Sequence, residues 1–305
     1  MRLPRTLRYL LILLLALFLV VAAAVGGLWL YFHPRHEYRS GIVYSQRQGQ
    51  ELTLDIVRPA RPNGIGVLLL VSGGWKSHRD SFRPWIAAPL LRRGYTIFPV
   101  YHISQPEATI TEIAEDMHRA VRFVRFHARE YGVDPNRLGV TGGSAGGHLS
   151  LLLATRGGPG PADAPDPVDR ESSAVQAVAI FYPVTDLLNL GSSTENPGDG
   201  GPPKSFVKGF GPEATNLTVW KGIGRELSPI YFLTTNLPPC LIFHGDADTL
   251  VPLDQSQRFQ AEAAKLGATV QVVVHPGGHH GWPTMLWDIR RFGDWFDRYL
   301  RRPDR

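Results

Sequence analysis

A serine stands between two pairs of glycines in the stretch VTGGSAGGHLS, residues 140–150. Residues 142–146 fit the pattern Gly-x-Ser-x-Gly, in which a strand turns sharply into a helix and leaves the serine hydroxyl exposed. An apolar segment precedes the turn and a segment typical of a helix follows it. Ser144 can therefore act as a nucleophile, with the N–H of Ala145 directed at the oxyanion that forms.

Two other uses of a glycine-rich turn fit poorly. A phosphate-binding loop places Lys and Ser/Thr after its second glycine, and His148 and Leu149 occupy those positions here. A dinucleotide-binding turn needs Gly-x-Gly-x-x-Gly, a spacing that these glycines lack. The motif alone also allows a structural turn with an unreactive serine, so a nucleophile needs partners elsewhere in the chain.

Candidates for those partners follow later apolar segments. In this type of turn the serine is followed along the chain by an acid and then by a histidine. The segment FHGDADTLVP offers Asp246 and Asp248, and HPGGHHGWP offers His275, His279 and His280. Both sets come directly after a predicted strand, at the edge where open α/β sheets place their sites. The spacing leaves open which aspartate and which histidine are used.

The stretches YGVDPNRLGVTGGSAGGHLS, HGDADTLVPLDQS and PGGHHGW together resemble the α/β-hydrolase fold. The nearest branch is the carboxylesterase and feruloyl-esterase-like (BD-FAE-like) group, which is related to hormone-sensitive-lipase-like esterases. The resemblance covers about residues 50–300. It implies that Ser144 is the nucleophile, that Asp248 rather than Asp246 is the acid, and that His280 rather than His279 is the base.

Another aspartate, Asp186 in YPVTDL, also follows a strand and could in principle serve as the acid. We interpret it as a residue that caps a loop. The three histidines of HPGGHHGWP could suggest a metal cluster, but no second set of ligands has the required spacing. We therefore expect no metal and no other cofactor.

The sequence departs from the family upstream of the nucleophile. The family usually carries His-Gly-Gly-Gly-Trp after the third strand, and this chain reads VSGGW. Val71 replaces the histidine and Ser72 replaces the first glycine, so a side chain that would brace the loop is lost. The oxyanion donors that remain are backbone amides, those of Gly73, Gly74, Trp75 and Ala145.

The resemblance implies a serine hydrolase that cleaves carboxylic esters by acyl transfer, through an acyl-enzyme. The substrates that it implies are small-molecule or carbohydrate-linked esters, such as acetyl or feruloyl esters. Two alternatives stay open. The same three residues could cleave amides or peptides, or the chain could be a membrane-anchored binding protein with a hydrolase fold and no catalysis.

The elements that must position these residues follow from the alternation of apolar runs with segments of helical periodicity. The predicted strands are residues 52–57, 66–72, 96–101, 137–142, 174–182, 240–245 and 269–275. The predicted helices are residues 109–131, 145–155, 253–267 and 284–300. Such alternation indicates the α/β class, with a mostly parallel sheet covered by helices on both faces. We predict surface loops at residues 157–173 and 191–215. The second loop is either a cap over the site or a tolerated insertion.

The N-terminus carries a long apolar segment. Residues 9–32 contain no charge and follow three arginines. A segment of this length can form a membrane-spanning signal anchor, and it also allows a cleaved signal peptide. The leading arginines favour a cytoplasmic N-terminus, so the catalytic domain would lie outside the cytoplasm, anchored or secreted. We expect a basic segment at 1–8, the apolar segment at 9–32, a juxtamembrane linker at 33–45 and the catalytic domain at 46–302.

Composition excludes two further classes. The first 40 residues hold +4 of the net charge of +5, so the remainder is nearly neutral and no basic run interleaved with aromatic residues follows. We therefore expect no binding to nucleic acid. The single cysteine, Cys240, rules out an internal disulfide framework and lies in an apolar run that is typical of a buried, unreactive thiol.

Overall fold

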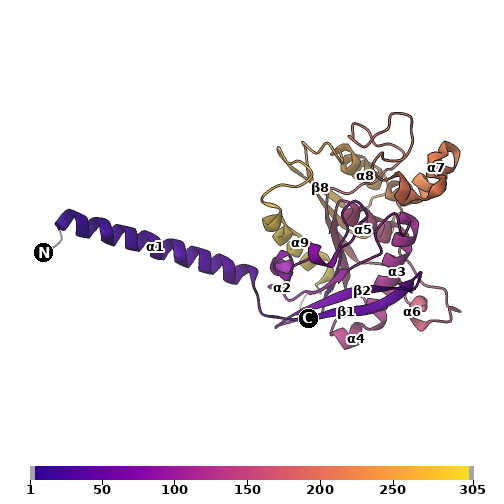
Figure 1. The fold of residues 1–305 in the computed structure, drawn as a ribbon. Coiled ribbons are helices and arrows are strands. Elements are labelled where there is room, and N and C mark those ends of the chain that lie inside the picture. The colour runs from indigo at the N-terminus through magenta and orange to yellow at the C-terminus, as the bar shows by residue number, and fades with distance from the viewer. Residues whose placement is uncertain (1–3, 302–305) are drawn as a thin grey trace.

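The computed structural model describes residues 4–301 (Figure 1). Arg2 of the predicted basic segment and Arg302, the predicted end of the catalytic domain, lie outside the described residues. Within them, one eight-stranded sheet has the order β1-β2-β4-β3-β5-β6-β7-β8. The strands are β1 (His36–Arg47), β2 (Gln50–Pro59), β3 (Gly66–Leu70), β4 (Thr96–Val100), β5 (Leu138–Gly143), β6 (Ala177–Phe181), β7 (Cys240–Gly245) and β8 (Val270–His275). β1 and β2 pair antiparallel with their neighbours, and the six strands from β4 to β8 pair in parallel.

Helices cover both faces of this sheet. The helices are α1 (Arg5–Phe32), α2 (Ala88–Leu91), α3 (Ile110–Phe126), α4 (Ala128–Tyr131), α5 (Ala145–Arg156), α6 (Pro167–Arg170), α7 (Leu217–Glu226), α8 (Asp254–Lys265) and α9 (Met285–Leu300). One core lies under α3, α5 and α8, and a second core lies under α2 and α9. The α/β class and the α/β-hydrolase fold are confirmed. The parallel arrangement brings the carboxyl ends of β3, β5, β7 and β8 to one edge of the sheet.

The first strand of the sheet differs from expectation. Residues 33–45 were expected to form a linker and the catalytic domain to begin at 46, but β1 runs over most of that stretch and is the edge strand of the sheet. Tyr44 is its one buried residue, since the other side chains are exposed or half-buried. An edge strand that faces solvent needs little apolar alternation, which is why its sequence resembles a linker.

The predicted helix 109–131 is divided in the structure. It ends as α3 at Phe126 and continues as the short α4 after His127. Its start matches the sequence because Thr109 and Glu112 form a capping box that satisfies the first backbone amides. The four-residue helix α6 lies in the predicted loop 157–173, and α7 follows the predicted loop 191–215.

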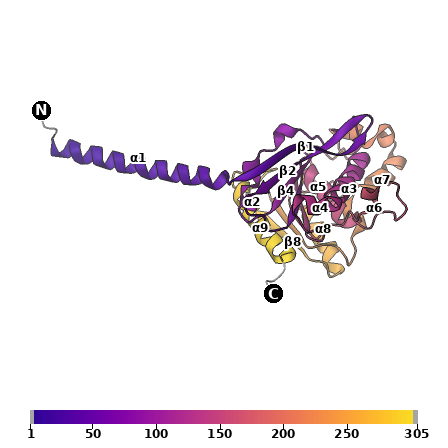
Figure 2. The same cartoon turned by 90° about the horizontal axis from the view of Figure 1, so that it is seen from below.

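Helix α1 projects from the body and is exposed except at its last two residues, Tyr31 and Phe32, which are half-buried (Figures 1 and 2). It is apolar enough and, at 28 residues, long enough to cross a membrane. Its end is held against the body, where the guanidinium of Arg92 donates to the carbonyls of Leu30 and Tyr31, both at 2.7 Å. The ring of Phe32 packs against Trp85 and Trp287.

Candidate active site

The nucleophile turn joins β5 to α5 at the centre of the sheet. Ser144 has φ +55° and ψ −119°, a backbone conformation that side-chain-bearing residues rarely adopt. Glycines make the turn possible: a Cβ on Gly142 would lie 2.6 Å from the carbonyl of Gly146, and a Cβ on Gly146 would lie 2.4 Å from the carbonyl oxygen of Leu70. Larger residues would force the strand and the helix apart and withdraw the serine.

Three side chains from three loops form one hydrogen-bonded chain. The hydroxyl of Ser144 lies 2.8 Å from Nε2 of His280, in the loop after β8. Nδ1 of His280 lies 2.7 Å from Oδ2 of Asp248, in the loop after β7. This order gives His280 an Nδ1–H that donates to the carboxylate and an Nε2 that accepts the serine proton. The arrangement has the geometry of a nucleophile, a general base and an orienting acid.

The environment of Asp248 keeps its carboxylate ionised. Burial alone would raise the pKa, but the nearby imidazole of His244, 3.6 Å away, and hydrogen bonds from His280 and the amide of Val251 outweigh it, so the pKa of Asp248 lies well below its usual range. Oδ1 accepts from the amides of Leu250 and Val251, both at 3.0 Å. These amides fix the carboxylate while Oδ2 faces the histidine. A fixed anion at this point orients the imidazole and stabilises its charged form.

The neighbouring candidates have other partners. Asp246 is exposed and accepts a hydrogen bond from the amide of Gly277 at 2.7 Å. His279 is exposed and places Nδ1 3.1 Å from the carbonyl of Ala247. His275 stacks on Trp282 with ring centroids 4.7 Å apart. Among the described residues, no group of three or more His, Cys, Asp or Glu side chains is arranged to hold a metal ion.

The remaining alternative acid, Asp186, caps its own loop. Its Oδ1 accepts from the amides of Leu188 and Asn189, at 3.1 and 3.2 Å, and its Oδ2 accepts from Arg258 at 2.7 Å. The two loop amides fit the loop-capping interpretation, while Arg258 of α8 and the hydroxyl of Tyr231, 3.1 Å from Oδ1, contact the same carboxylate from other parts of the chain. Cys240, also outside the site, is buried, and burial raises the pKa of its thiol.

A small cavity of about 60 Å³ lies over the nucleophile. Its walls include Ser144, which carries the hydroxyl, and three of the residues whose amides are predicted oxyanion donors: Gly74, Trp75 and Ala145. No hydrogen bond recorded among residues 4–301 uses the amides of Gly74, Trp75 or Ala145. The fourth predicted donor, the amide of Gly73, donates to the carbonyl of Lys76 at 2.9 Å. Three amides without a hydrogen-bond partner among the described residues therefore belong to residues that line the cavity together with Ser144.

The segment 191–215 forms the opposite wall of this cavity. Ser193, Glu195, Pro203 and Phe206 all line it. The ring of Phe206 packs edge-on against Trp75, with centroids 5.2 Å apart. Of the two interpretations that the sequence allows, the structure favours the cap, because the segment lines the same cavity as Ser144.

The altered oxyanion loop is braced by residues that the sequence did not single out for this role. Nε2 of His102, on the segment after β4, accepts from the hydroxyl of Ser72 at 2.9 Å, and Nδ1 lies 2.7 Å from the carbonyl of Ile103. On the other side, the indole N–H of Trp75 donates to Nδ1 of His148 at 3.1 Å. The expected loss of a brace is therefore offset: Ser72, which replaces a glycine, creates the contact.

Burial keeps both bracing histidines neutral. It lowers the pKa of His102 to about 4 and that of His148 to about 4, and hydrogen bonds to backbone carbonyls oppose it only in part. A neutral imidazole has one nitrogen that donates and one that accepts, which is the pattern each of these residues uses. The only sequence feature that points to His148 as a brace is its position four residues after Ser144. No sequence feature points to His102.

Tyr182 is a further residue of the site that the sequence left unassigned. It follows β6 with φ +32°, and its ring lies 4.5 Å from the ring of His280. Burial and then the charge of Asp248 raise the pKa of Tyr182 to about 12, so its hydroxyl stays protonated. The tilted ring packs against the imidazole of His280. Its positive φ in a non-glycine residue is the kind of strain that accompanies functional sites.

Comparison with known proteins shows which family the chain resembles over most of its length. The BD-FAE family model matches residues 54–263. Esterase LipQ of Mycobacterium tuberculosis is 32% identical over 264 residues, which are 81% of this chain and 58% of LipQ. An acetylxylan esterase of Xylanibacter ruminicola is 24% identical over 78% of this chain and 43% of its own length. The chain spans about half the length of the curated relatives that it matches.

Solved structures of esterases have the same fold. The native esterase 2 of Thermogutta terrifontis superposes with a TM-score of 0.66 at 26% identity, over 87% of this chain and 92% of that one. A truncated carbohydrate esterase from gut microbiota superposes with a TM-score of 0.67 at 25% identity, over 86% and 96% of the two chains.

Proposed function

This chain belongs to the BD-FAE family of α/β hydrolases, and from that premise we propose that it hydrolyses carboxylic esters with Ser144 as nucleophile, His280 as general base and Asp248 as orienting acid. The observation that carries the proposal is the hydrogen-bonded chain from the Ser144 hydroxyl through His280 to Asp248, at 2.8 and 2.7 Å.

The reaction proceeds in two half-reactions. As the Ser144 oxygen attacks the ester carbonyl, its proton passes to Nε2 of His280, and the carbonyl oxygen becomes an oxyanion. When the tetrahedral intermediate collapses, the imidazolium returns that proton to the departing alcohol and an acyl-enzyme remains. Water, deprotonated by the same nitrogen, then attacks the acyl-enzyme and releases the acid.

The free amides supply the electrostatic part of catalysis. Those of Gly74, Trp75 and Ala145 line the cavity that holds the serine hydroxyl. A well-aimed donor of this kind contributes about 2.7–4 kcal/mol to stabilising the transition state, which is roughly 10²–10³ in kcat. Trp75 is held by His148, and Ser72 by His102, so the loop is positioned before the substrate arrives.

The size of the small cavity favours a short acyl group. At about 60 Å³ it is well below the roughly 300 Å³ at which pockets hold drug-sized ligands. An acetyl group fits such a space and a feruloyl group, with its aromatic ring, does not. Among the two kinds of ester suggested by the sequence, the cavity therefore supports acetyl esters. The name of the relative from Xylanibacter ruminicola, an acetylxylan esterase, agrees with this choice.

The contacts of α1 favour a retained anchor over a cleaved signal. Arg92 donates to the last carbonyls of the helix, and Phe32 packs on two tryptophans of the body. A segment removed after export would not need a seat on the folded domain. We place the helix in a membrane with the leading arginines on the cytoplasmic side and the catalytic domain on the other side.

Ester turnover by the full chain in detergent tests the proposal. We expect hydrolysis of p-nitrophenyl acetate, reduced at least 10³-fold in Ser144→Ala. Turnover of an aminoacyl-anilide should be far slower than that of the ester. Faster cleavage of the anilide would assign the site to amides, and a folded protein that cleaves neither would leave a binding role for the same fold.

A further inference from the structure

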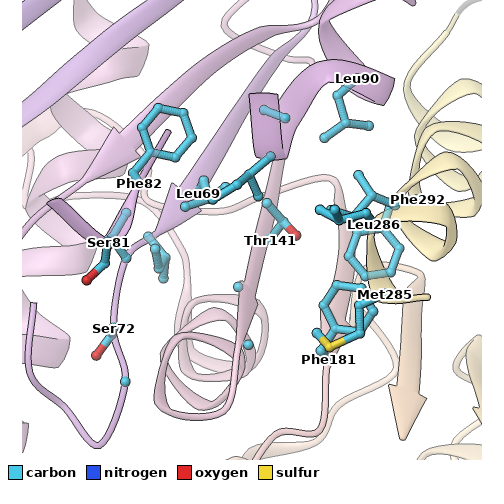
Figure 3. Close-up of a pocket in the computed structure, with 18 of the residues that line it drawn as sticks. Leu69, Ser72, Ser81, Phe82, Leu90, Thr141, Phe181, Met285, Leu286 and Phe292 are labelled. Carbon is cyan, nitrogen blue, oxygen red and sulfur yellow. The ribbon is translucent and has the colours of Figure 1, made fainter. Parts of the chain in front are cut away.

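A second and larger cavity, of about 390 Å³, lies on the opposite side of the sheet from α5. It is enclosed by the segment 82–90, which leads into α2, and by the first turns of α9 (Figure 3). Figure 3 shows Phe82 on the left, and Leu90, Leu286 and Phe292 on the right, and all four line the same cavity. Its volume is in the range of pockets that hold a whole small-molecule ligand, and its lining is mostly apolar.

The inner end of this cavity reaches the neighbours of the catalytic residues. Gly143, which precedes the nucleophile, and Ser72 and Gly73 of the oxyanion loop form part of its wall. Tyr182 also lines it, and the Tyr182 ring is the one that lies 4.5 Å from His280. The cavity therefore begins on the histidine side of the nucleophile. That is the side on which a leaving alcohol must stand to receive its proton from Nε2 of His280.

The outer walls of this cavity are the same two segments that hold the end of α1. Ile86 and Leu286 line the cavity. Their chain neighbours, Trp85 and Trp287, hold the ring of Phe32 between them, with centroids 6.5 and 5.6 Å away. The cavity and the contact site of the apolar helix are thus formed by adjacent residues of the same two segments.

Exposure of these aromatic side chains is consistent with a membrane interface. Trp85 and Trp287 are 39% and 43% exposed although both pack against the ring of Phe32. Trp29, one turn before the end of α1, is 59% exposed. Tryptophans gather at the level of lipid headgroups, where one end of the ring is apolar and the other is wet. When α1 spans the bilayer, these residues place the α2–α9 face of the body on the lipid surface.

We propose that the 390 Å³ cavity receives the apolar chain of an alcohol whose short acyl ester resides in the membrane that α1 spans. The substrate class is then an acetyl ester of a long-chain, amphiphilic alcohol, with the acetyl group in the 60 Å³ cavity and the alkyl chain in the larger one. Reaction follows the two half-reactions given above: the alcohol leaves with the proton from His280, and water then releases acetate. This inference rests on the proposed esterase activity and on α1 as a membrane anchor.

The delivery of substrate from the enzyme's own membrane is tested with the full chain in phosphatidylcholine vesicles. Octadecyl acetate is placed either in the same vesicles as the protein or in separate vesicles, and released acetate is measured. We expect hydrolysis at least tenfold faster when enzyme and ester share a bilayer. Equal rates would overturn membrane delivery.

Hydrolysis of water-soluble p-nitrophenyl acetate by the same vesicles separates the two levels of the proposal. If this ester is cleaved and octadecyl acetate is not, the substrate inference fails while the esterase activity stands. If neither is cleaved, the proposed esterase activity itself fails.

The place of the alkyl chain is tested by narrowing the cavity. We compare the ratio of kcat/KM for dodecyl acetate to that for ethyl acetate in Leu286→Trp, in Ile289→Phe and in Leu266→Trp. Leu266 is 38% exposed, directly after α8, and serves as the matched control. The ratio should fall at least tenfold in both cavity variants and stay unchanged in the control, because each buried methylene contributes about fourfold to binding.

The reversed ester, methyl dodecanoate, fixes the orientation. It should be a poor substrate of the wild type, since its long chain lies on the acyl side. If it is cleaved faster than dodecyl acetate, or if the cavity variants impair it alone, the assignment of the larger cavity to the alcohol is overturned. Thermal melting of each variant verifies that it is folded, and the second cavity variant keeps the test decisive if the first does not fold.

Discussion

The residues that carry the chemistry depend on polar neighbours as much as on one another. His280 is oriented by Asp248, and Asp248 is in turn fixed by two backbone amides. The sequence predicts the three principal residues because their motifs are local and follow a known order. It does not predict His102 as a brace, because its contact with Ser72 joins residues 30 positions apart through the packing of β4 beside β3.

Replacement of Asp248 by asparagine is expected to lower kcat for p-nitrophenyl acetate by about 10⁴-fold with little effect on folding. An amide at this place holds the imidazole in the wrong tautomer, so Nε2 can no longer accept the serine proton. Asp246→Asn is the matched control, since that exposed carboxylate bonds only to a loop amide. An equal loss of activity in the two variants would show that the acid has been assigned incorrectly.

Removal of the Ser72 hydroxyl is expected to lower kcat by about three- to tenfold and to leave KM nearly unchanged. The hydroxyl donates to buried His102, and such a bond is worth about 0.5–1.5 kcal/mol. A looser loop aims its amides less well at the oxyanion, an effect confined to the transition state. Ser77→Ala in the same loop is the control, because the Ser77 hydroxyl is buried without a partner. A rise in KM at constant kcat in Ser72→Ala would contradict this role.

At the scale of the elements, the sequence predicts strands and helices with strong periodicity and misses those whose form depends on neighbours. β5, α5, β7 and α9 lie within one or two residues of their expected bounds. β1 was missed because an edge strand exposes most of its side chains. The segment 191–215 has no periodicity, and only its packing over the nucleophile identifies it as a cap.

Opening of that cap is expected to change selectivity for the acyl chain. Phe206 packs against Trp75 and lines the 60 Å³ cavity, so Phe206→Ala leaves room for further methylenes. The ratio of kcat/KM for p-nitrophenyl butyrate to that for the acetate should rise several-fold, at about fourfold for each methylene that becomes buried. Phe126→Ala, at an exposed phenylalanine of α3, should not alter the ratio. An unchanged ratio in Phe206→Ala would place the acyl group elsewhere.

At the scale of the whole molecule, the proposed catalysis is combined with the proposed attachment to a membrane. The end of the projecting helix α1 (Figure 1) contacts the body through Arg92 and an aromatic cluster. The two cavities lie beside the turn after β5, at the carboxyl ends of the parallel strands. The sequence predicts the helix itself from its length and apolarity. The seat could not be predicted, because it joins residues that are far apart in the chain.

The free energy of unfolding is expected to fall as the pH drops from 7 to 5. His102 and His148 are buried with pKa values lowered to about 4, whereas an unfolded histidine titrates near 6.5. Between these pH values the unfolded chain binds protons that the folded chain does not. For each histidine, the free energy of unfolding therefore falls by up to about 1.4 kcal/mol for each pH unit. Urea unfolding at pH 5, 6 and 7 measures the slope, which His148→Asn should reduce. Stability that is constant or higher at pH 5 would contradict the neutral state of these residues.

The central claim, that Ser144 is a nucleophile activated by His280, is tested most directly by a covalent label. The full chain is treated with a fluorophosphonate and the modified peptide is identified by mass spectrometry. We expect one stoichiometric adduct on Ser144, no adduct in Ser144→Ala, and strongly slowed labelling in His280→Ala, whereas His279→Ala should react as the wild type does. A folded protein that forms no adduct, or forms it on another serine, would contradict the account.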